Sequence, residues 1–132
     1  MPFQCVLVTP EAQLLDESVE QVILPAFDGL MGILKDHAHL LVKLGPGPLR
    51  VDRSASQQMY YFVDGGVAQM RDNKLTILSP QAMLAGAIDA EAALAAYHAA
   101  AGRKTTTEAD AAQRELEMSR ARAQRAVAGK AR

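Results

Sequence analysis

The chain has few of the residues that build aromatic cores or disulfide-linked scaffolds. Its 132 residues include no Trp, three Tyr, three Phe and a single cysteine, Cys5. One cysteine cannot form an internal disulfide, which indicates a reduced, intracellular environment and makes Cys5 a small hydrophobe in a strand. The net charge is only -1, so composition gives no reason to expect nucleic acid as a partner.

Long apolar runs and targeting segments are also missing. No stretch approaches the roughly 20 apolar residues that a membrane-spanning helix needs. The N-terminus, MPFQCVLV, lacks the basic flank and the long apolar core of a signal peptide. We therefore expect any membrane role to come through a partner.

Catalytic fingerprints are absent as well. The sequence contains no G-x-S-x-G elbow, no Walker loop and no glycine-rich dinucleotide fingerprint. Ser54 and Ser56 lie in a polar segment, RSASQQ, without an obvious base. We expect a chain that is not itself catalytic and needs no cofactor.

The first part of the chain, residues 1–86, consists of short β-type runs. In order, these are FQCVLV, VEQVILP, LMGIL, HLLVKLG, PLRVD, MYYFVD, GVAQM and KLTILS. Their spacing is typical of an antiparallel, all-β sandwich or barrel. Asp64-Gly65-Gly66 and Asp72-Asn73 are predicted to form tight hairpin turns. Gly45-Pro46-Gly47-Pro48 is predicted to be a bend that cannot continue a ladder.

Alanine dominates the second part, residues 87–132, which holds 17 Ala and almost no β-branched residues. This composition predicts two helices, Ala90–Ala101 and Glu108–Val127, joined by a short polar loop. Asp89 and Thr107 are the expected N-caps. The predicted architecture is therefore a β-sandwich at 1–86 followed by an antiparallel two-helix hairpin at 87–132.

The apolar faces predicted for these helices are thin. Helical spacing selects small residues almost throughout: Ala92, Ala95, Ala96 and Ala99 on the first helix, and Ala109, Ala112, Leu116, Ser119 and Ala123 on the second. Burying a methyl group contributes about 0.8 kcal/mol, against about 1.5–3 for a Leu or Phe side chain. The helices should form readily but dock weakly, which would permit the hairpin to leave the sandwich. An ordinary, stably docked hairpin is the alternative.

Basic residues gather near the end of the chain, where residues 111–132 carry six Lys and Arg against two Glu. On a helix, Arg114, Arg122 and Arg125 share one broad face, and Arg120 lies well away from it. Such a face is either solvated or directed at an acidic protein surface or a phosphate. Nucleic acid is the weakest of these possibilities, because no aromatic residue stands among the arginines to stack on bases.

Two histidines in GILKDHAHLL raise the possibility of a metal site. His37 and His39 are spaced so that both would point to one face of a strand. Asp36 would point to the opposite face, and a zinc ion needs three or four ligands. A stand-alone sandwich that binds a metal or small ligand through His37 and His39 is thus an alternative function, although we expect no metal.

Several motifs together resemble the epsilon subunit of the F-type ATP synthase. They are PAFDGLMGILKDHAHLLVKLGPGPLRV, FVDGGVAQM, NKLTILS and the Ala- and Arg-rich helical hairpin. The resemblance covers essentially the whole chain, in the family's order. The family's pattern G-I-x-x-x-H-A-P-L-L matches here at His37, Ala38, Leu40 and Leu41, whereas His39 stands where the family usually has Pro. The spacing of His37 and His39 would then result from a single replacement, of Pro by His at position 39.

This resemblance implies a mechanical role without catalysis. A subunit of this kind would sit in the central stalk, at the cytoplasmic face of a bacterial plasma membrane. Its sandwich would bind the gamma subunit and the ring of c subunits, and would help to couple ion-driven rotation to ATP synthesis. The matching residues that would face the c ring are Asp28, Gly29, Leu30, Met31, Gly32 and His37. Leu30 occupies a place that is often acidic in the family.

The resemblance also implies a regulatory hairpin. Folded against the sandwich it would permit ATP hydrolysis, and extended along gamma it would inhibit by touching the catalytic beta subunits. Arg114, Arg122 and Arg125 are the candidate contacts to beta. Some relatives bind ATP through I-D-x-x-R-A, which matches here at Ile88 and Asp89, but Ala92 replaces the arginine. Without that guanidinium we expect no ATP binding.

Overall fold

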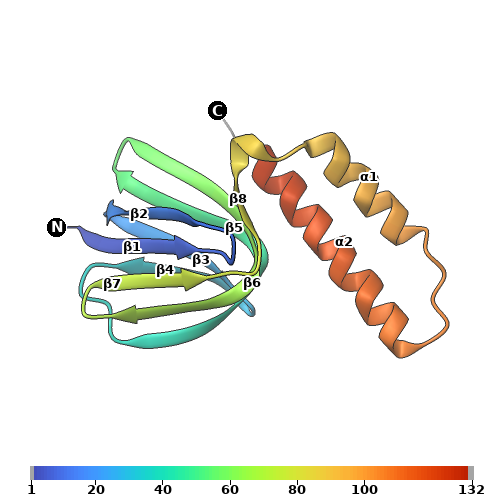
Figure 1. Cartoon of the computed structure of the whole chain (residues 1–132), viewed down its shortest axis with the longest axis horizontal. Helices are drawn as coiled ribbons and strands as arrows, with labels where there is room; N and C mark the ends of the chain where they lie inside the picture. The colour runs from blue at the N-terminus through green and yellow to red at the C-terminus, as the bar shows by residue number, and fades with distance from the viewer. Residues whose placement is uncertain (1, 131–132) are drawn as a thin grey trace.

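The computed structural model describes residues 2–130 and consists of a β body followed by two helices (Figure 1). Its elements are β1 (Phe3–Val8), β2 (Gln13–Val19), β3 (Gln21–Ala26), β4 (Gly29–Leu34), β5 (Leu40–Ser54), β6 (Gln57–Arg71), β7 (Lys74–Leu78), β8 (Ala82–Leu84), the short 3₁₀ helix η1 (Ala85–Ala87), α1 (Ala90–Ala101) and α2 (Glu108–Ala128). The predicted fold class, a β-sandwich followed by a helical hairpin, is confirmed. Below, the sandwich means β1 to β8 and the hairpin means α1 and α2.

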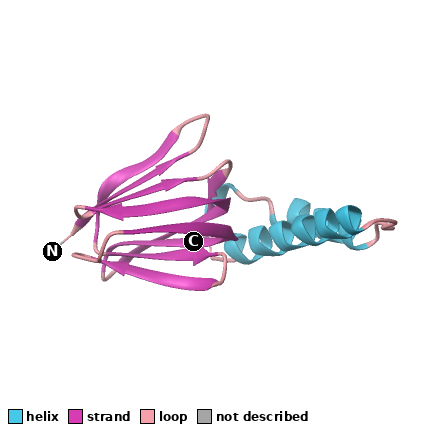
Figure 2. Ribbon diagram, turned by 90° about the horizontal axis from the view of Figure 1, so that it is seen from below, coloured by secondary structure: helices cyan, strands magenta, loops and turns pink. Residues whose placement is uncertain are grey.

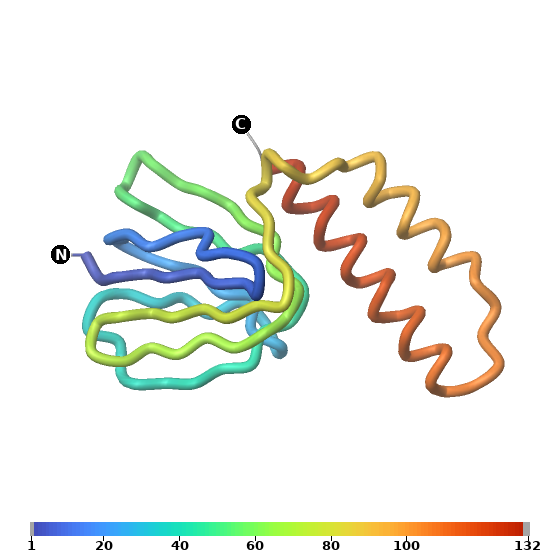
Figure 3. Tube along the Cα trace, viewed as in Figure 1, coloured from blue at the N-terminus to red at the C-terminus, as the bar shows by residue number. Residues whose placement is uncertain are grey.

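The strands form one hydrogen-bonded sheet in the order β2-β1-β7-β6-β5-β3-β4, with β8 also paired to β6. The sheet folds over on itself into two layers, as Figures 2 and 3 show. All pairs are antiparallel except β1 and β7, which run parallel. β5 and β6, at 15 residues each, belong to both layers. Residues 67–71 of β6 pair with β7, whereas residues 61–63 pair with β8.

The hairpin turn predicted at Asp64-Gly65-Gly66 is wrong, because β6 runs through this segment. Gly65 and Gly66 adopt φ angles of 77° and 113° and kink the strand where it passes from one layer to the other. A Cβ on Gly66 would lie 2.0 Å from the carbonyl oxygen of Leu78, so only glycine fits there. Gly65 and Gly66, whose positive φ angles would also suit a tight turn, form a bend within one continuous strand here. The turn predicted at Asp72-Asn73 is confirmed, with φ angles of 52° and 59°.

The ladder break predicted at Gly45-Pro46-Gly47-Pro48 is also wrong. Pro46 pairs with Asp64 and Pro48 with Phe62, so β5 continues through the segment. On the other side of β5, the ladder to β3 has a register shift and pairs none of residues 45–49. The stretch therefore behaves locally like an edge strand, where proline's missing N–H is tolerated.

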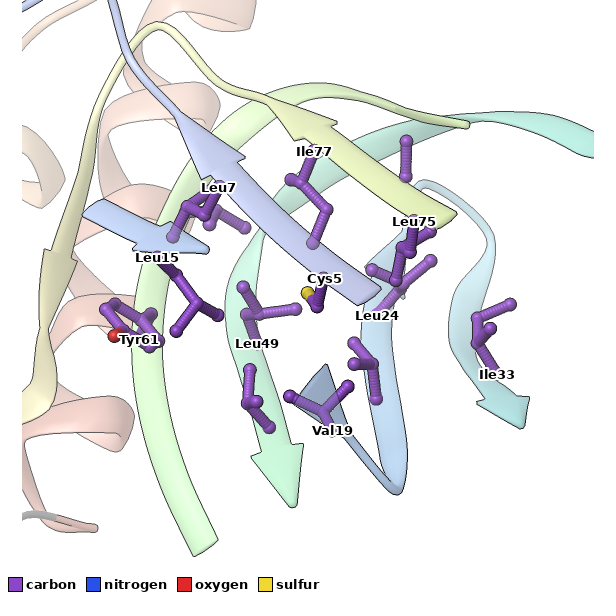
Figure 4. Packing of buried hydrophobic residues seen from close by; sticks show 14 of the residues in the cluster. Cys5, Leu7, Leu15, Val19, Leu24, Ile33, Leu49, Tyr61, Leu75 and Ile77 are labelled. Carbon is purple, nitrogen blue, oxygen red and sulfur yellow. The ribbon is translucent and has the colours of Figure 1, made fainter. Parts of the chain in front are cut away.

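The core lies between the two layers and is almost entirely aliphatic. Inward residues alternate along the strands, and Figure 4 shows Cys5 and Leu7 of β1 beside Leu75 and Ile77 of β7, facing Leu24, Leu49 and Val19. Cys5 is fully buried, as predicted for a small hydrophobe. Its burial, with a smaller contribution from Glu17 and Asp16, raises the pKa of the thiol to about 12.

Both helices begin where the sequence predicts, and their caps are formed. The Asp89 carboxylate accepts hydrogen bonds from the backbone N–H groups of Glu91 and Ala92, at 3.0 and 3.1 Å. The Thr107 hydroxyl oxygen accepts from the N–H of Asp110 at 3.0 Å. α2 ends at Ala128, one residue beyond the prediction.

The predicted apolar faces are largely wrong. On α1, the alanines expected to be buried, at positions 92, 95, 96 and 99, are exposed, and Ala93 and Ala100 are buried instead. On α2, Ala109, Ala112 and Leu116 are exposed, whereas Ala121 and Val127 are buried. Ser119 and Ala123 are partly buried, as expected. Alanine occurs on every side of these helices, so its spacing alone could not select the buried side.

Candidate interaction surfaces

The hairpin rests on the outside of the sandwich through a small apolar seam. Its buried members are Phe62 of β6, Ala85 of η1 and Val127 of α2. Tyr60, Met83, Ile88 and Ala123 pack around them. In Figure 1, α2 lies between the sandwich and α1, so α2 provides the contact. Along β6, Tyr61 and Val63 point into the main core, and Phe62 points out to the seam.

A charged pair flanks this seam. The Nε atom of Arg120 on α2 lies 2.8 Å from Oδ2 of Asp64 at the corner of β6, and the two side chains are 33% and 12% exposed. The Arg120 Nε–H group is buried and is not directed at an acceptor with hydrogen-bond geometry, so this contact is an ion pair. Lys130 lies over the ring of Tyr60, 5.6 Å from its centroid. Sequence reasoning set Arg120 apart from the basic face but did not identify its role.

The three arginines proposed to contact the beta subunit lie on the hairpin. Arg122 lies over the ring of Tyr97 on α1, with its guanidinium carbon 5.6 Å from the centroid. Arg114 donates to the carbonyl oxygen of Arg103 at 3.5 Å. Arg125 is exposed. Two of the three thus hold α1 and its loop to α2 in this arrangement.

The residues matched to the family's c-ring segment do not form one cluster. Asp28 lies in the turn between β3 and β4, and Gly29 to Gly32 belong to β4 itself. Phe27 and Leu30, at 69% and 68% exposed, form an apolar surface here that we call the β3–β4 tip. His37 follows the other end of β4, about 20 Å away for a six-residue strand. The structure therefore separates His37 from the other five residues.

The two histidines also have separate partners. The His39 Nε2 atom accepts from the backbone N–H of Asp72 at 3.3 Å and lies 3.4 Å from the Asp72 carboxylate. The His37 Nδ1 atom lies 2.9 Å from the carbonyl oxygen of Ala38. Within residues 2–130, no group of three or more His, Cys, Asp or Glu side chains could hold a metal ion. His39 instead joins the β4–β5 connection to the β6–β7 turn, beside the paired side chains of Asp36 and Asn73.

The residues that match the nucleotide motif have structural contacts. The Asp89 carboxylate caps α1, and Ile88 packs against the apolar seam. A cleft of about 750 Å³ opens nearby between the β5–β6 turn, β8 and the end of α2. Its lining includes Ser56, Gln58 and Lys130, and neither Ile88 nor Asp89 belongs to it.

A second apolar surface lies on the layer that contains β1 and β7. Register places Val8 beside Leu78 and Leu78 beside Val67. On β5, Lys43 pairs with Val67, and Leu41 lies two residues further along, paired with Gln69. These residues point away from the core, and Leu41, Leu78 and Val67 are 73%, 48% and 38% exposed. We call Val8, Leu41, Val67 and Leu78 the outer sheet face. It continues into an apolar groove beside Pro10 and Pro80.

These features define one class of protein, a β-sandwich with two exposed apolar surfaces and an alanine-rich helical hairpin docked at its side. Residues 2–85 match the family described as "ATP synthase, Delta/Epsilon chain, beta-sandwich domain", and the chain belongs to this family.

Full-length relatives carry the same family name. The chain is 35% identical over 124 residues to the ATP synthase epsilon chain of Rhodopirellula baltica, covering 94% of this chain and 96% of that protein. It is 37% identical over 132 residues to the chloroplastic epsilon chain of Nephroselmis olivacea, with 97% of each covered. The similarity to epsilon chains thus extends over nearly all of the chain.

Solved structures share the fold. A chain in the Euglena gracilis mitochondrial ATP synthase (OSCP/F1/c-ring) superposes with a TM-score of 0.86 at 24% identity, covering 95% of this chain and 80% of that chain. A chain in the Tetrahymena thermophila mitochondrial ATP synthase central stalk and c ring gives a TM-score of 0.71 at 17% identity, with 95% of each covered. Neither helix described between residues 2 and 130 has the length and apolarity needed to cross a bilayer.

Proposed function

We propose that this chain is a non-catalytic subunit of the central stalk of an F-type ATP synthase, where it helps to couple ion-driven rotation of the c ring to ATP synthesis. Its family membership and its full-length epsilon-chain relatives carry this proposal. We divide the chain at residue 86, with residues 1–86 gripping the stalk and residues 87–132 regulating hydrolysis. The subunit would be held at the cytoplasmic face of a bacterial plasma membrane through its partners.

The outer sheet face is our candidate for the gamma contact. It combines exposed Leu and Val side chains on a hydrogen-bonded layer that has no helix of this chain over it. Apolar patches of this kind commonly mark protein interfaces. A hydrogen-bonded strand surface would hold a rotating partner without local rearrangement, because side chains on a ladder have fixed spacing.

The β3–β4 tip is our candidate for the c-ring contact. Phe27 and Leu30 project two large apolar side chains next to Asp28, at the residues matched to the family's c-ring segment. Because the tip is apolar where relatives are often acidic, burial of Phe27 and Leu30 would contribute more than any ion pair. His37 lies at the other end of β4, so we assign it no part in this contact.

The hairpin is the proposed regulatory part. In the docked arrangement seen here, Arg122 is partly engaged with Tyr97 and Arg125 is free to meet solvent. Extension of α2 along gamma would present Arg114, Arg122 and Arg125 together to an acidic segment of a beta subunit. A small apolar seam supports this role, because a switch needs two states that differ by only a few kcal/mol.

Affinity purification of the tagged full chain from its native membranes tests the function directly. We expect gamma, c and beta subunits to be recovered with it. Leu41→Asp and Leu78→Asp should each lower the recovery of gamma more than tenfold, because a charge would be buried at the interface. Leu34→Asp is the matched control, since Leu34 is 56% exposed but lies on β4. Purification of a correctly folded chain with no gamma subunit would falsify the proposal.

A further inference from the structure

We propose that Asp64 and Arg120 form an electrostatic latch that sets how often the hairpin is docked on the sandwich. The proposal extends the regulatory role given above and rests on it only for the consequence for ATP hydrolysis. The pair joins the two parts of the molecule. Each of the other ion pairs described in residues 2–130 joins residues within the sandwich or within the hairpin.

The acidic member of the latch is held on a rigid support. Asp64 lies at the corner of β6, immediately before the two glycines with positive φ. Its backbone N–H donates to the carbonyl oxygen of Gln81 at 2.9 Å, and it pairs with Pro46 across the ladder. The Asp64 side chain is only 12% exposed, so the surrounding groups limit where its carboxylate can lie. It therefore marks one place on the sandwich where α2 can rest.

The basic member lies on the docking side of α2. Arg120, Ala123 and Val127 follow the spacing i, i+3, i+7, which places them on one face of a helix. Ala123 and Val127 belong to the apolar seam, so the same face carries both the seam and the charge. Docking of Val127 against Phe62 thus brings Arg120 to Asp64. The three arginines of the proposed beta contact are not part of this face.

The chemistry of the pair suits a contact that must open. Arg120 Nε is buried and lacks a well-directed hydrogen bond, so part of the electrostatic attraction is offset by lost hydration. A partly exposed ion pair contributes little net free energy and is weakened by salt. Docking therefore depends on a small apolar seam, on this ion pair and on the contact of Lys130 with the ring of Tyr60. Removal of either charge would shift the balance without unfolding the sandwich.

The populations can be measured by fluorescence resonance energy transfer in the full chain. Dyes would be placed at Leu14→Cys and Leu116→Cys, which are exposed positions on the sandwich and on α2, while the native Cys5 is buried. Asp64→Asn and Arg120→Gln should each raise the undocked-to-docked ratio at least about twofold at low salt, because each leaves the other charge without its partner in the docked state. Higher salt should raise the undocked-to-docked ratio of the native chain and should leave that of both variants almost unchanged.

A matched control and a charge exchange make the test specific. Arg125→Gln removes one positive charge from an exposed position on the same helix and should leave the ratio unchanged. The double variant Asp64→Arg with Arg120→Asp should dock better than either single replacement. The latch is wrong if Asp64→Asn shifts the ratio no more than Arg125→Gln does, or if the exchanged pair docks no better than its single members.

The consequence for function is measured separately in the assembled complex. Asp64→Asn should slow ATP hydrolysis, because more hairpins would be free to extend, while the recovery of gamma stays at the native level. Altered docking without any change in hydrolysis would leave the latch standing and remove the regulatory role proposed for the hairpin. Unaltered docking in a normally assembled complex would remove the latch and leave the regulatory role of the hairpin standing.

Discussion

The sandwich and the hairpin are stabilised in different ways. The sandwich encloses its core between two layers, and side chains that point into it, such as Leu49 and Ile77, are fully buried. The hairpin has no interior of comparable depth. It meets the sandwich through the apolar seam around Phe62 and Val127, one ion pair and the contact of Lys130 with the ring of Tyr60. The sandwich is therefore held by a deep core and the hairpin by a shallower contact, which is the feature on which its proposed regulatory role rests.

Most of the stability of the chain therefore comes from the sandwich core. Each fully buried Leu or Ile contributes roughly 1.5–3 kcal/mol, and the sandwich holds many of them. The helices form through local hydrogen bonds, capped ends and alanine's high helix propensity. Substitutions in the sandwich core should act on the whole molecule, and substitutions in the hairpin should act locally.

The largest effect is expected from a core substitution. Ile77→Ala should lower the free energy of unfolding by about 2–5 kcal/mol, because Ile77 is fully buried and its removal leaves a cavity. Chemical denaturation followed by circular dichroism would measure this. Leu94→Ala on α1, a partly exposed position, is the comparison and should cost clearly less. Equal losses would mean that the hairpin is as deeply packed as the sandwich.

The corner of β6 should be nearly as sensitive. Gly66→Ala should cost about 2–4 kcal/mol, because the new Cβ would collide with Leu78 and alanine disfavours positive φ. Gly86→Ala is the matched control, since a Cβ there meets nothing within 4 Å. Thermal unfolding of both variants gives the comparison. A mild effect at Gly66 would show that β6 can pass between the layers by another path.

Alkaline pH should weaken the sandwich through Cys5. Its folded-state pKa of about 12 lies above the ordinary value of 9.0, so the buried thiol favours folding only while it stays protonated. That contribution is complete below pH 9 and is lost as pH rises toward 12. By pH 10.5 the loss is about 2 kcal/mol. The stability difference between the native chain and Cys5→Ala, measured by urea unfolding at pH 7 and pH 10.5, should shrink accordingly.

The smallest effect is expected at a helix cap. Asp89→Ala should destabilise α1 by about 1 kcal/mol, because two backbone N–H groups lose their acceptor. Amide hydrogen exchange should accelerate in the first turn of α1 and stay unchanged in β1 and β7. Asp89→Ser keeps a capping oxygen, so amides in the first turn of α1 should exchange at nearly the native rate in this variant. Faster exchange throughout the sandwich would contradict the separation of the two parts.

Local chemistry explains which predictions from the sequence succeeded. The bounds and caps of the helices follow from nearby residues, so Asp89 and Thr107 could be identified directly. The turn at Asp72-Asn73 depends equally on its own two residues. The family resemblance rested on longer motifs and was confirmed by the match at residues 2–85.

The failures all concern contacts that are distant in the sequence. Gly65 and Gly66 permit a turn or a corner, and the pairing of β6 with both β7 and β8 decides between them. The prolines of β5 are tolerated because β3 is out of register beside them. The buried side of each helix, and with it the role of Arg120, depends on how α2 meets Phe62. No periodicity within the helices could supply that orientation.

The passage of β5 and β6 through both layers has a mechanical consequence. Two separate stacked sheets could slip past one another, since only side-chain packing would resist shear. Here a continuous backbone joins the layers at the corners near Pro46 and Gly66. A twisting force applied to one layer must reach the other through covalent bonds and paired strands. In the proposed stalk role, the sandwich would therefore transmit torque as a single body, because its two layers cannot shear past one another.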